Sequence, residues 1–193
     1  MPKHNPTVVS DDLLMQLKLC KIELPVQDVP ANGREWRYQA DEPELHELSN
    51  IIGLGKLGSL EIIYEVSHFR KNSFKMTSDI KLEIEQSCVI TLNPVTSKLH
   101  DIAATRFVPQ HIFEEITNSD EDDILEDDNL EPIADSRLNI GRILYEQITG
   151  AINPYPRAPG VEFDPASGAD PNDDGADLGP FAGLAKLKKS DSN

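Results

Sequence analysis

The central part of the chain alternates between apolar and polar residues, which is the pattern of half-buried β-strands. Between Leu57 and Val108 it contains the segments LEIIYEVSHF, SFKMTSDIKLEIEQSCVITL and SKLHDIAATRFV, which are rich in β-branched and aromatic residues. The polar sequences RKNS and NPVT separate these segments and are typical of turns. The pattern predicts three or more antiparallel strands.

The region before these strands shows the same alternation less regularly. Residues Leu13 to Leu24 favour a strand, although the alternation is imperfect. The Asn32-Gly33 pair that follows is typical of a tight turn. Trp36 and Tyr38 are two positions apart, so we expect them to share one face of a second strand.

Two other segments carry apolar residues at helical spacing. The first begins after Asp41, a favourable N-cap residue, has acidic residues in its first turn and ends at Gly53. The second runs from Ser136 to Ile152 and has one broad apolar face. The patterns together predict an α+β fold. We expect an antiparallel sheet that could close into a barrel, two main helices, and an acidic, partly disordered C-terminal tail.

Charge divides the chain into two unlike parts. The formal net charge is −16, of which Met1 to Phe113 contribute −3 (12 Lys+Arg against 15 Asp+Glu) and Glu114 to Asn193 contribute −13 (6 against 19). We expect residues 1–157 to form one α+β domain with a mobile acidic loop at 118–131. Residues 158–193 are rich in Gly, Ala, Pro and Asp, and we expect an acidic, mostly disordered tail that ends in the short amphipathic element FAGLAKLKK.

The acidic loop indicates the kind of partner. Its sequence DEDDILEDDNLE contains no Lys or Arg. Mutual repulsion favours an open loop, and the same charge would suit docking of a basic protein. An acidic surface repels phosphate groups, so contact with RNA is expected only indirectly or through a small surface. The candidate partner contacts in this loop are its aspartates, namely Asp120, Asp122, Asp123, Asp127 and Asp128.

Motifs for catalysis or cofactor binding are weak. Gly53 to Gly58 spells G-x-G-x-x-G, but a predicted helix precedes it and a strand follows, the reverse of a dinucleotide site. Asp170 to Gly175 resembles half of a calcium loop, but Phe181 stands where the bidentate glutamate should be. The five histidines have no metal-ligand spacing. We therefore expect no cofactor, no metal, no catalytic residues and no enzymatic activity.

The two cysteines and the N-terminal sequence bear on location. Cys20 and Cys88 do not form a C-x-x-C pair, which suits reduced thiols in a cytoplasm. The first residues lack the apolar core of a signal peptide, and no apolar run is long enough to cross a membrane. We expect a soluble, cytoplasmic protein that does not contact membranes.

The segment INPYPRAPG, from Ile152 to Gly160, carries three prolines that impose a stiff, extended path. Tyr155 and Arg157 lie between these prolines. They could contact RNA or a protein partner, because an aromatic ring stacks and a guanidinium forms bidentate hydrogen bonds. Alternatively, Tyr155 packs on the domain and Arg157 pairs with a local carboxylate; the residue types favour this second interpretation.

Two stretches resemble one known family. The sequence from Glu83 to Pro109 and the sequence from Gly141 to Gly160, with an acidic EPI segment between them, resemble the YceD family of large ribosomal RNA subunit accumulation proteins. Many members carry a second cysteine three residues after the first, where this chain has Thr91. The positions that match the family's motifs are Cys88, Pro94, Arg106, Glu131, Pro132, Gln147, Pro154 and Pro156.

The resemblance implies a ribosome-biogenesis factor needed for accumulation of the large-subunit ribosomal RNA. With the charge argument, it suggests a non-catalytic acidic adaptor or chaperone whose partner is a basic ribosomal protein or assembly factor. Two other classes stay open at this point. One is a general protein-binding module outside ribosome assembly, and the other is a metal-dependent hydrolase that uses the acidic loop.

Overall fold

The computed structural model describes residues 14, 16–70, 72–118 and 129–161. By its internal contacts the chain divides into two units, Met1–Ala158 and Pro159–Asn193, and all helices and strands of the described residues lie in the first unit. No helix in these described ranges is long and apolar enough to cross a membrane.

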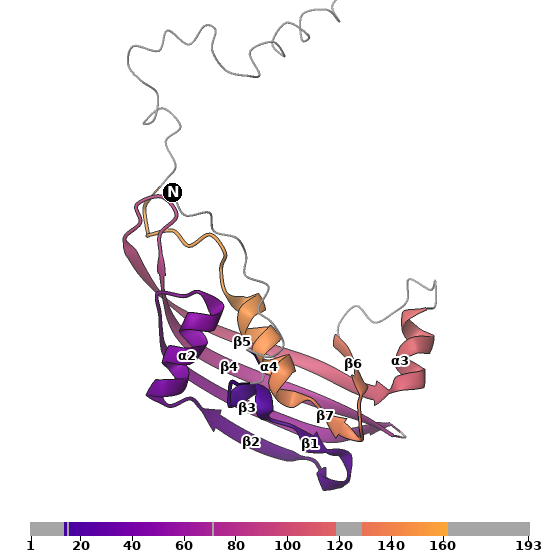
Figure 1. Ribbon diagram of the computed structural model, residues 1–193. Coiled ribbons are helices and arrows are strands. Elements are labelled where there is room, and N and C mark those ends of the chain that lie inside the picture. The colour runs from indigo at the N-terminus through magenta and orange to yellow at the C-terminus, as the bar shows by residue number, and fades with distance from the viewer. Residues whose placement is uncertain (1–13, 15, 71, 119–128, 162–193) are drawn as a thin grey trace, which may run out of the picture. The chain divides into compact units, whose positions relative to one another are not determined.

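The first unit is built on a five-stranded sheet in the order β2-β3-β4-β5-β6 (Figure 1). Neighbouring strands are antiparallel except β5 and β6, which run parallel. The fold class is α+β, as predicted, but the sheet stays open with β2 and β6 at its edges, so the expected closure into a barrel is wrong. The strands of this sheet are β2 (Arg34–Gln39), β3 (Lys56–Arg70), β4 (Ser73–Ser87), β5 (Pro94–Pro109) and β6 (Asn129–Ile133).

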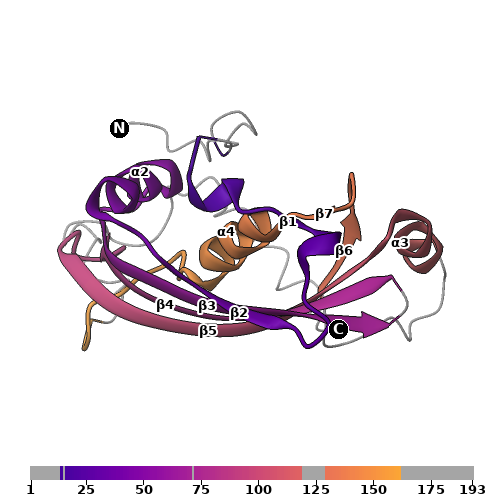
Figure 2. The same ribbon diagram turned by 90° about the horizontal axis from the view of Figure 1, so that it is seen from below.

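The alternation between Leu57 and Val108 correctly predicted the three long central strands. On each strand every second side chain faces the same way, and this apolar face is covered by helices α2 (Glu42–Ile52) and α4 (Ile140–Ala151) (Figure 2). Trp36 and Tyr64, on neighbouring strands of the same face, stack with ring centroids 5.6 Å apart. The most completely buried members of the core include Leu60, Ile62, Met76, Ile80, Phe107, Leu144 and Ile148.

The helix predicted after Asp41 is α2. The Asp41 side chain accepts a hydrogen bond from the Glu44 N–H at 3.0 Å, and the Glu44 side chain accepts one from the Asp41 N–H at 3.1 Å. This capping box satisfies two backbone donors at the helix start. Gly53 ends the helix in the left-handed conformation (φ +78°), and the chain then turns directly into β3, so the glycine-rich motif is a helix-to-strand turn.

The predicted strand between Leu13 and Leu24 is wrong within the described residues. They form a short 3-10 helix, Leu19–Lys21, and the two-residue strand β1 (Leu24–Pro25), which pairs with β7 (Arg137–Leu138). The Ile22 carbonyl accepts a hydrogen bond from the Gly141 N–H at 2.8 Å. The backbone of this segment therefore follows its packing against the start of α4 and not the alternation of its own sequence.

Further elements differ from the predictions, and the second predicted helix begins at Ile140 rather than at Ser136. The chain turns after β4 at residues 88–93, earlier than the predicted NPVT turn, and Pro94 already begins β5. A third helix, α3 (Gln110–Thr117), follows β5 where none was predicted. The last residues of the predicted acidic loop, 129–131, belong to β6, and residues 119–128 lie outside the described ranges.

Candidate functional site: a carboxylate-lined pocket beside helix α4

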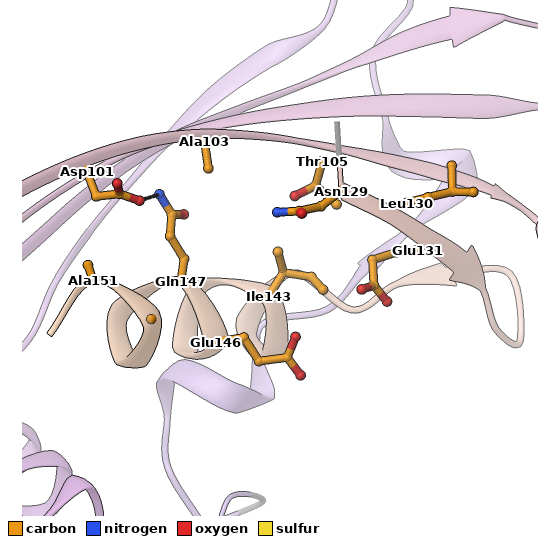
Figure 3. Close-up of a pocket in the computed structure, with 11 residues that line it drawn as sticks. Asp101, Ala103, Thr105, Asn129, Leu130, Glu131, Ile143, Glu146, Gln147 and Ala151 are labelled. Atoms are coloured by element: carbon orange, nitrogen blue, oxygen red, sulfur yellow. Dashed lines mark hydrogen bonds between the residues drawn. The ribbon is translucent and has the colours of Figure 1, made fainter. Parts of the chain in front are cut away.

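A pocket of about 450 Å³ lies between helix α4 and strands β5 and β6 (Figure 3). Two of the family-motif positions, Glu131 and Gln147, lie in its wall although they are far apart in sequence. Ile143 and Leu130 give the pocket an apolar part. The polar residues that line it are Asp101, Thr105, Asn129, Glu131, Glu146 and Gln147.

The backbone explains why these side chains converge. Strand alternation places Asp101 and Thr105 on the face of β5 that α4 covers. The parallel pairing of β5 with β6 sets Phe107 opposite Glu131, which brings the EPI segment beside the same face. One turn of α4 then supplies Glu146 and Gln147. The pocket therefore depends on three elements meeting.

Gln147 is fixed on one side of the pocket. Its amide nitrogen donates to the Asp101 carboxylate at 2.8 Å, and its amide oxygen accepts from the Ser78 hydroxyl at 2.6 Å (Figure 3 shows the first bond). Ser78 is only 2% exposed, so this acceptor satisfies a buried donor on β4. Gln147 thereby links α4 to the central strand β4. Because its amide is uncharged, it leaves the negative charge of Asp101 in place.

The other side of the pocket is acidic. Burial raises the pKa of the Glu131 carboxyl above its ordinary value, the nearby Glu146 raises it further, and Arg142 opposes the shift. Arg142 donates to the Glu146 carboxylate at 2.8 Å, one helical turn away and exposed. Glu131 is thus a half-buried carboxylate next to a second carboxylate, and a cationic group entering the pocket would relieve both effects.

The side chains that line the pocket indicate what kind of group could enter it. They are mainly carboxylates, amides and aliphatic groups, and they include no Ser, Cys, His or Lys. Within the described residues, no group of three or more His, Cys, Asp or Glu side chains is placed to hold a metal ion. Separated carboxylates around an apolar floor suit a Lys or Arg side chain, whose stem is apolar and whose head is charged.

Cys88 lies in the turn after β4, completely buried, rather than within a strand. Its sulfur accepts hydrogen bonds from the Thr91 N–H at 3.5 Å and from the Ala158 N–H at 3.4 Å. A hydrogen bond from the Thr91 hydroxyl, followed by these two bonds and one from the Ile90 N–H, lowers the pKa of the Cys88 thiol to about 6, although burial opposes the shift. Thr91, which replaces the second cysteine found in many family members, therefore sits directly against Cys88.

The proline-rich segment runs from α4 to this turn. Pro156 is buried, and its carbonyl accepts a hydrogen bond from the Val89 N–H at 2.9 Å. Tyr155, however, is 71% exposed, so the expectation that its ring packs on the domain is wrong. Arg157 is also exposed and forms no ion pair with any described residue. Pro156 anchors the segment, and the two contact candidates are exposed.

The remaining predicted positions are dispersed. Arg106 is buried on β5 with its guanidinium carbon 5.6 Å from the centroid of the Phe69 ring. Pro132 pairs with Val108 in the β5–β6 register. Pro94 begins β5 and Pro154 is exposed in the proline-rich segment. The five aspartates of the acidic loop lie outside the described residues.

Sequence reasoning missed several residues of these two regions. Asp101 and Ser78 each interrupt the apolar face of a strand, and a polar residue in such a place was the available signal. Leu92 lies in a turn and is 77% exposed, which nothing in the alternation indicated. Glu146 stands beside Gln147 in the EQ pair that resembles the family motif, but its proximity to Glu131 was missed because it exists only in the folded chain.

Comparison with known proteins gives one match. The family model described as large ribosomal RNA subunit accumulation protein YceD matches residues 76–188, more than half of the chain and the whole of both regions described above. No curated protein and no solved structure matches the chain.

Proposed function

The chain belongs to the YceD family, whose name implies a role in accumulation of the large-subunit ribosomal RNA, and we propose that it acts there as a non-catalytic acidic adaptor for a basic protein. The partner is a basic ribosomal protein or assembly factor. RNA is reached through that protein. The pocket beside α4 is the specific part of its binding surface.

The observation that carries the proposal is that two carboxylates, Glu131 and Glu146, lie near each other in a partly apolar pocket. Burial and like charge both disfavour ionisation of a half-buried carboxylate next to a second one, and Arg142 offsets only part of this cost, since the pKa of Glu131 stays raised. Such a placement is explained when a cation from a partner occupies the site. The side chain of a Lys or Arg satisfies both carboxylates and covers the apolar surface of Ile143.

The net charge supports the same partner class. A formal charge of −16 gives a field that attracts basic proteins and repels bare RNA. Charge alone is unspecific, however, and would act on every basic protein in the cell. The pocket supplies the short-range contacts that select one.

The test compares the full chain with the double variant Glu131→Gln/Glu146→Gln. Both are used to capture partners from RNase-treated lysate at low salt, and the captured basic protein is identified, purified and titrated calorimetrically. We expect the double variant to bind it about tenfold more weakly, or about 1.4 kcal/mol. The variant Glu115→Gln alters an exposed carboxylate on α3, outside the pocket, and is expected to bind like the wild type.

The single variant Glu131→Gln separates function from stability. Because the pKa of Glu131 is raised in the folded state, its ionised form costs stability above that pKa. We therefore expect Glu131→Gln to unfold at higher urea concentration than the wild type at pH 7. This gain should shrink as the pH falls through the raised pKa of Glu131 and should be absent below the ordinary carboxyl range. Weaker binding by a more stable variant supports the proposal. Unchanged binding by the double variant, or capture that RNase abolishes, contradicts it.

A further inference from the structure

A second exposed surface lies where the turn after β4 meets the proline-rich segment after α4. The large apolar side chains that are exposed in the described part of the chain are Val89 (45%), Leu92 (77%), Ile102 (68%) and Tyr155 (71%). Three of the four belong to two segments that a backbone hydrogen bond joins and that lie side by side (Figures 1 and 2): Val89 and Leu92 to the turn, and Tyr155 to the proline-rich segment. We call this surface, made of residues 88–93 and 153–158, the apolar platform.

The platform is held rigidly from beneath. The Val89 N–H donates to the Pro156 carbonyl at 2.9 Å, and the Gln86 amide donates to the Asn153 carbonyl at 3.0 Å. The sulfur of Cys88 accepts from the Ala158 N–H. The Asn153 side chain accepts from the Tyr155 N–H at 2.9 Å, which fixes the backbone that carries the ring. A surface ordered in advance loses little conformational entropy when a partner binds.

Leu92 combines an exposed side chain with a strained backbone. Its φ angle is +61°, a left-handed conformation that glycine adopts freely and leucine does not. The side chain gains little burial in return, since it is 77% exposed. Strained residues that the fold does not need are found at binding sites.

The platform carries no carboxylate, in contrast to the acidic composition of the whole chain. The chain has 34 Asp and Glu residues among 193, but none occurs from Gln86 to His100 or from Gln147 to Val161. Arg157 is exposed on the platform and has no ion-pair partner among the described residues. Protein-binding hot spots have a similar composition: they combine aromatic and aliphatic side chains with Arg and contain few carboxylates.

We propose that the platform binds a second protein, different from the basic partner, which presents an apolar side chain beside a carboxylate. The apolar side chain covers Leu92 and Tyr155, and the carboxylate pairs with Arg157. Aliphatic Leu92 and Val89 favour a protein over RNA, because base stacking uses aromatic rings and phosphate binding needs more than one cation. The inference does not depend on the pocket beside α4. Only together with the proposed function does it make the molecule a bridge between two proteins.

The experiment compares three variants of the full chain. Leu92→Gly removes the side chain and relieves the backbone, so we expect its stability to be equal to or higher than that of the wild type. Arg157→Glu reverses the charge expected to pair with the partner. Ile102→Thr is the matched control, since Ile102 is similarly exposed but lies on the open face of β5. Each variant captures proteins from RNase-treated lysate, and proteins lost from the first two are identified, purified and titrated.

We expect one neutral or acidic protein whose affinity falls at least tenfold with Leu92→Gly and with Arg157→Glu, but not with Ile102→Thr or Glu131→Gln/Glu146→Gln. That result supports the platform even if the pocket binds nothing. The inference is overturned if a folded Leu92→Gly variant loses no protein or loses only RNA. It is equally overturned if the affected protein is the basic partner of the pocket, or if sedimentation shows that the wild type pairs with a second copy of itself through Leu92.

Discussion

At the scale of single residues, the two buried cysteines show how surroundings determine acidity. Burial, with a smaller contribution from Glu146, raises the pKa of the Cys20 thiol to about 11. The pKa of Cys88 is instead lowered to about 6, because the Thr91 hydroxyl and three backbone N–H groups donate to its sulfur. Both residues are buried thiols, so the difference comes from the donors.

This difference predicts a thiolate in the folded protein near neutral pH. We expect the thiolate absorbance at 240 nm to rise in a step near pH 6 that Cys88→Ser removes and that Thr91→Val moves to higher pH. The folded pKa lies below the ordinary value of 9.0, so the stabilisation is present above pH 9 and is lost as the pH falls through 6.

Urea unfolding gives the second readout of the Cys88 prediction. The stability of the wild type relative to Cys88→Ser should increase between pH 6 and pH 9. A stability difference that does not change across this range would show that Cys88 is an ordinary buried thiol. Cys20→Ala is the control, because the pKa of Cys20 lies above the range tested.

At the scale of elements, the contact between α4 and the 3-10 helix Leu19–Lys21 positions the pocket helix. A Cβ atom at Gly141 would overlap the carbonyl oxygen of Leu19 and the backbone of Cys20. Both of those neighbours are main chain, so neither can give way easily. Glycine is required here for close approach of two backbones, whereas a Cβ atom at Gly150, in the same helix, would meet no atom within 4 Å.

The two glycines give a matched pair of substitutions. We expect Gly141→Ala to destabilise the protein by roughly 3 kcal/mol, because the 3-10 helix must move away from α4. Gly150→Ala should instead stabilise it by about 0.5–1 kcal/mol, because alanine favours the helix and meets no neighbour. Urea unfolding measures both. Equal effects of the two substitutions would contradict the close approach at Gly141.

At the scale of the whole molecule, long-range and short-range charge should act on different steps of partner binding. The net charge of −16 accelerates the encounter with a basic protein. The range of this attraction is the Debye length, which salt shortens from about 30 Å at 0.01 M to about 10 Å at 0.1 M. The carboxylates of the pocket act after contact. The first effect changes the association rate and the second the dissociation rate.

The acidic loop offers the test. Replacing its aspartates by asparagine should lower the association rate at 0.01 M salt about tenfold and flatten its salt dependence. Glu131→Gln/Glu146→Gln should mainly raise the dissociation rate. Stopped-flow mixing with the purified basic partner measures both rates. An unchanged salt dependence would mean that the loop does not steer the partner. The loop variant carries Asp120→Asn, Asp122→Asn, Asp123→Asn, Asp127→Asn and Asp128→Asn.

The sequence alone determined the features that depend on neighbouring residues. Helix α2 was predicted because its capping residues, Asp41 and Gly53, act within one turn of the chain. The strands β3, β4 and β5 were predicted because alternation reports which side chains face a core, wherever that core is. The acidic character and the family motifs are also properties of the sequence itself.

Only the tertiary structure decided the features that join distant segments. The parallel pairing of β5 with β6 brings Glu131 beside Glu146, and strand alternation is the same for parallel and antiparallel partners. The backbone contact at Gly141 turned an expected strand into a 3-10 helix. The turn that carries Leu92 and the segment that carries Tyr155 became neighbours because hydrogen bonds between these two loops hold them together. Local sequence carries no information on these contacts, since their energies arise between residues that meet only when the chain has folded.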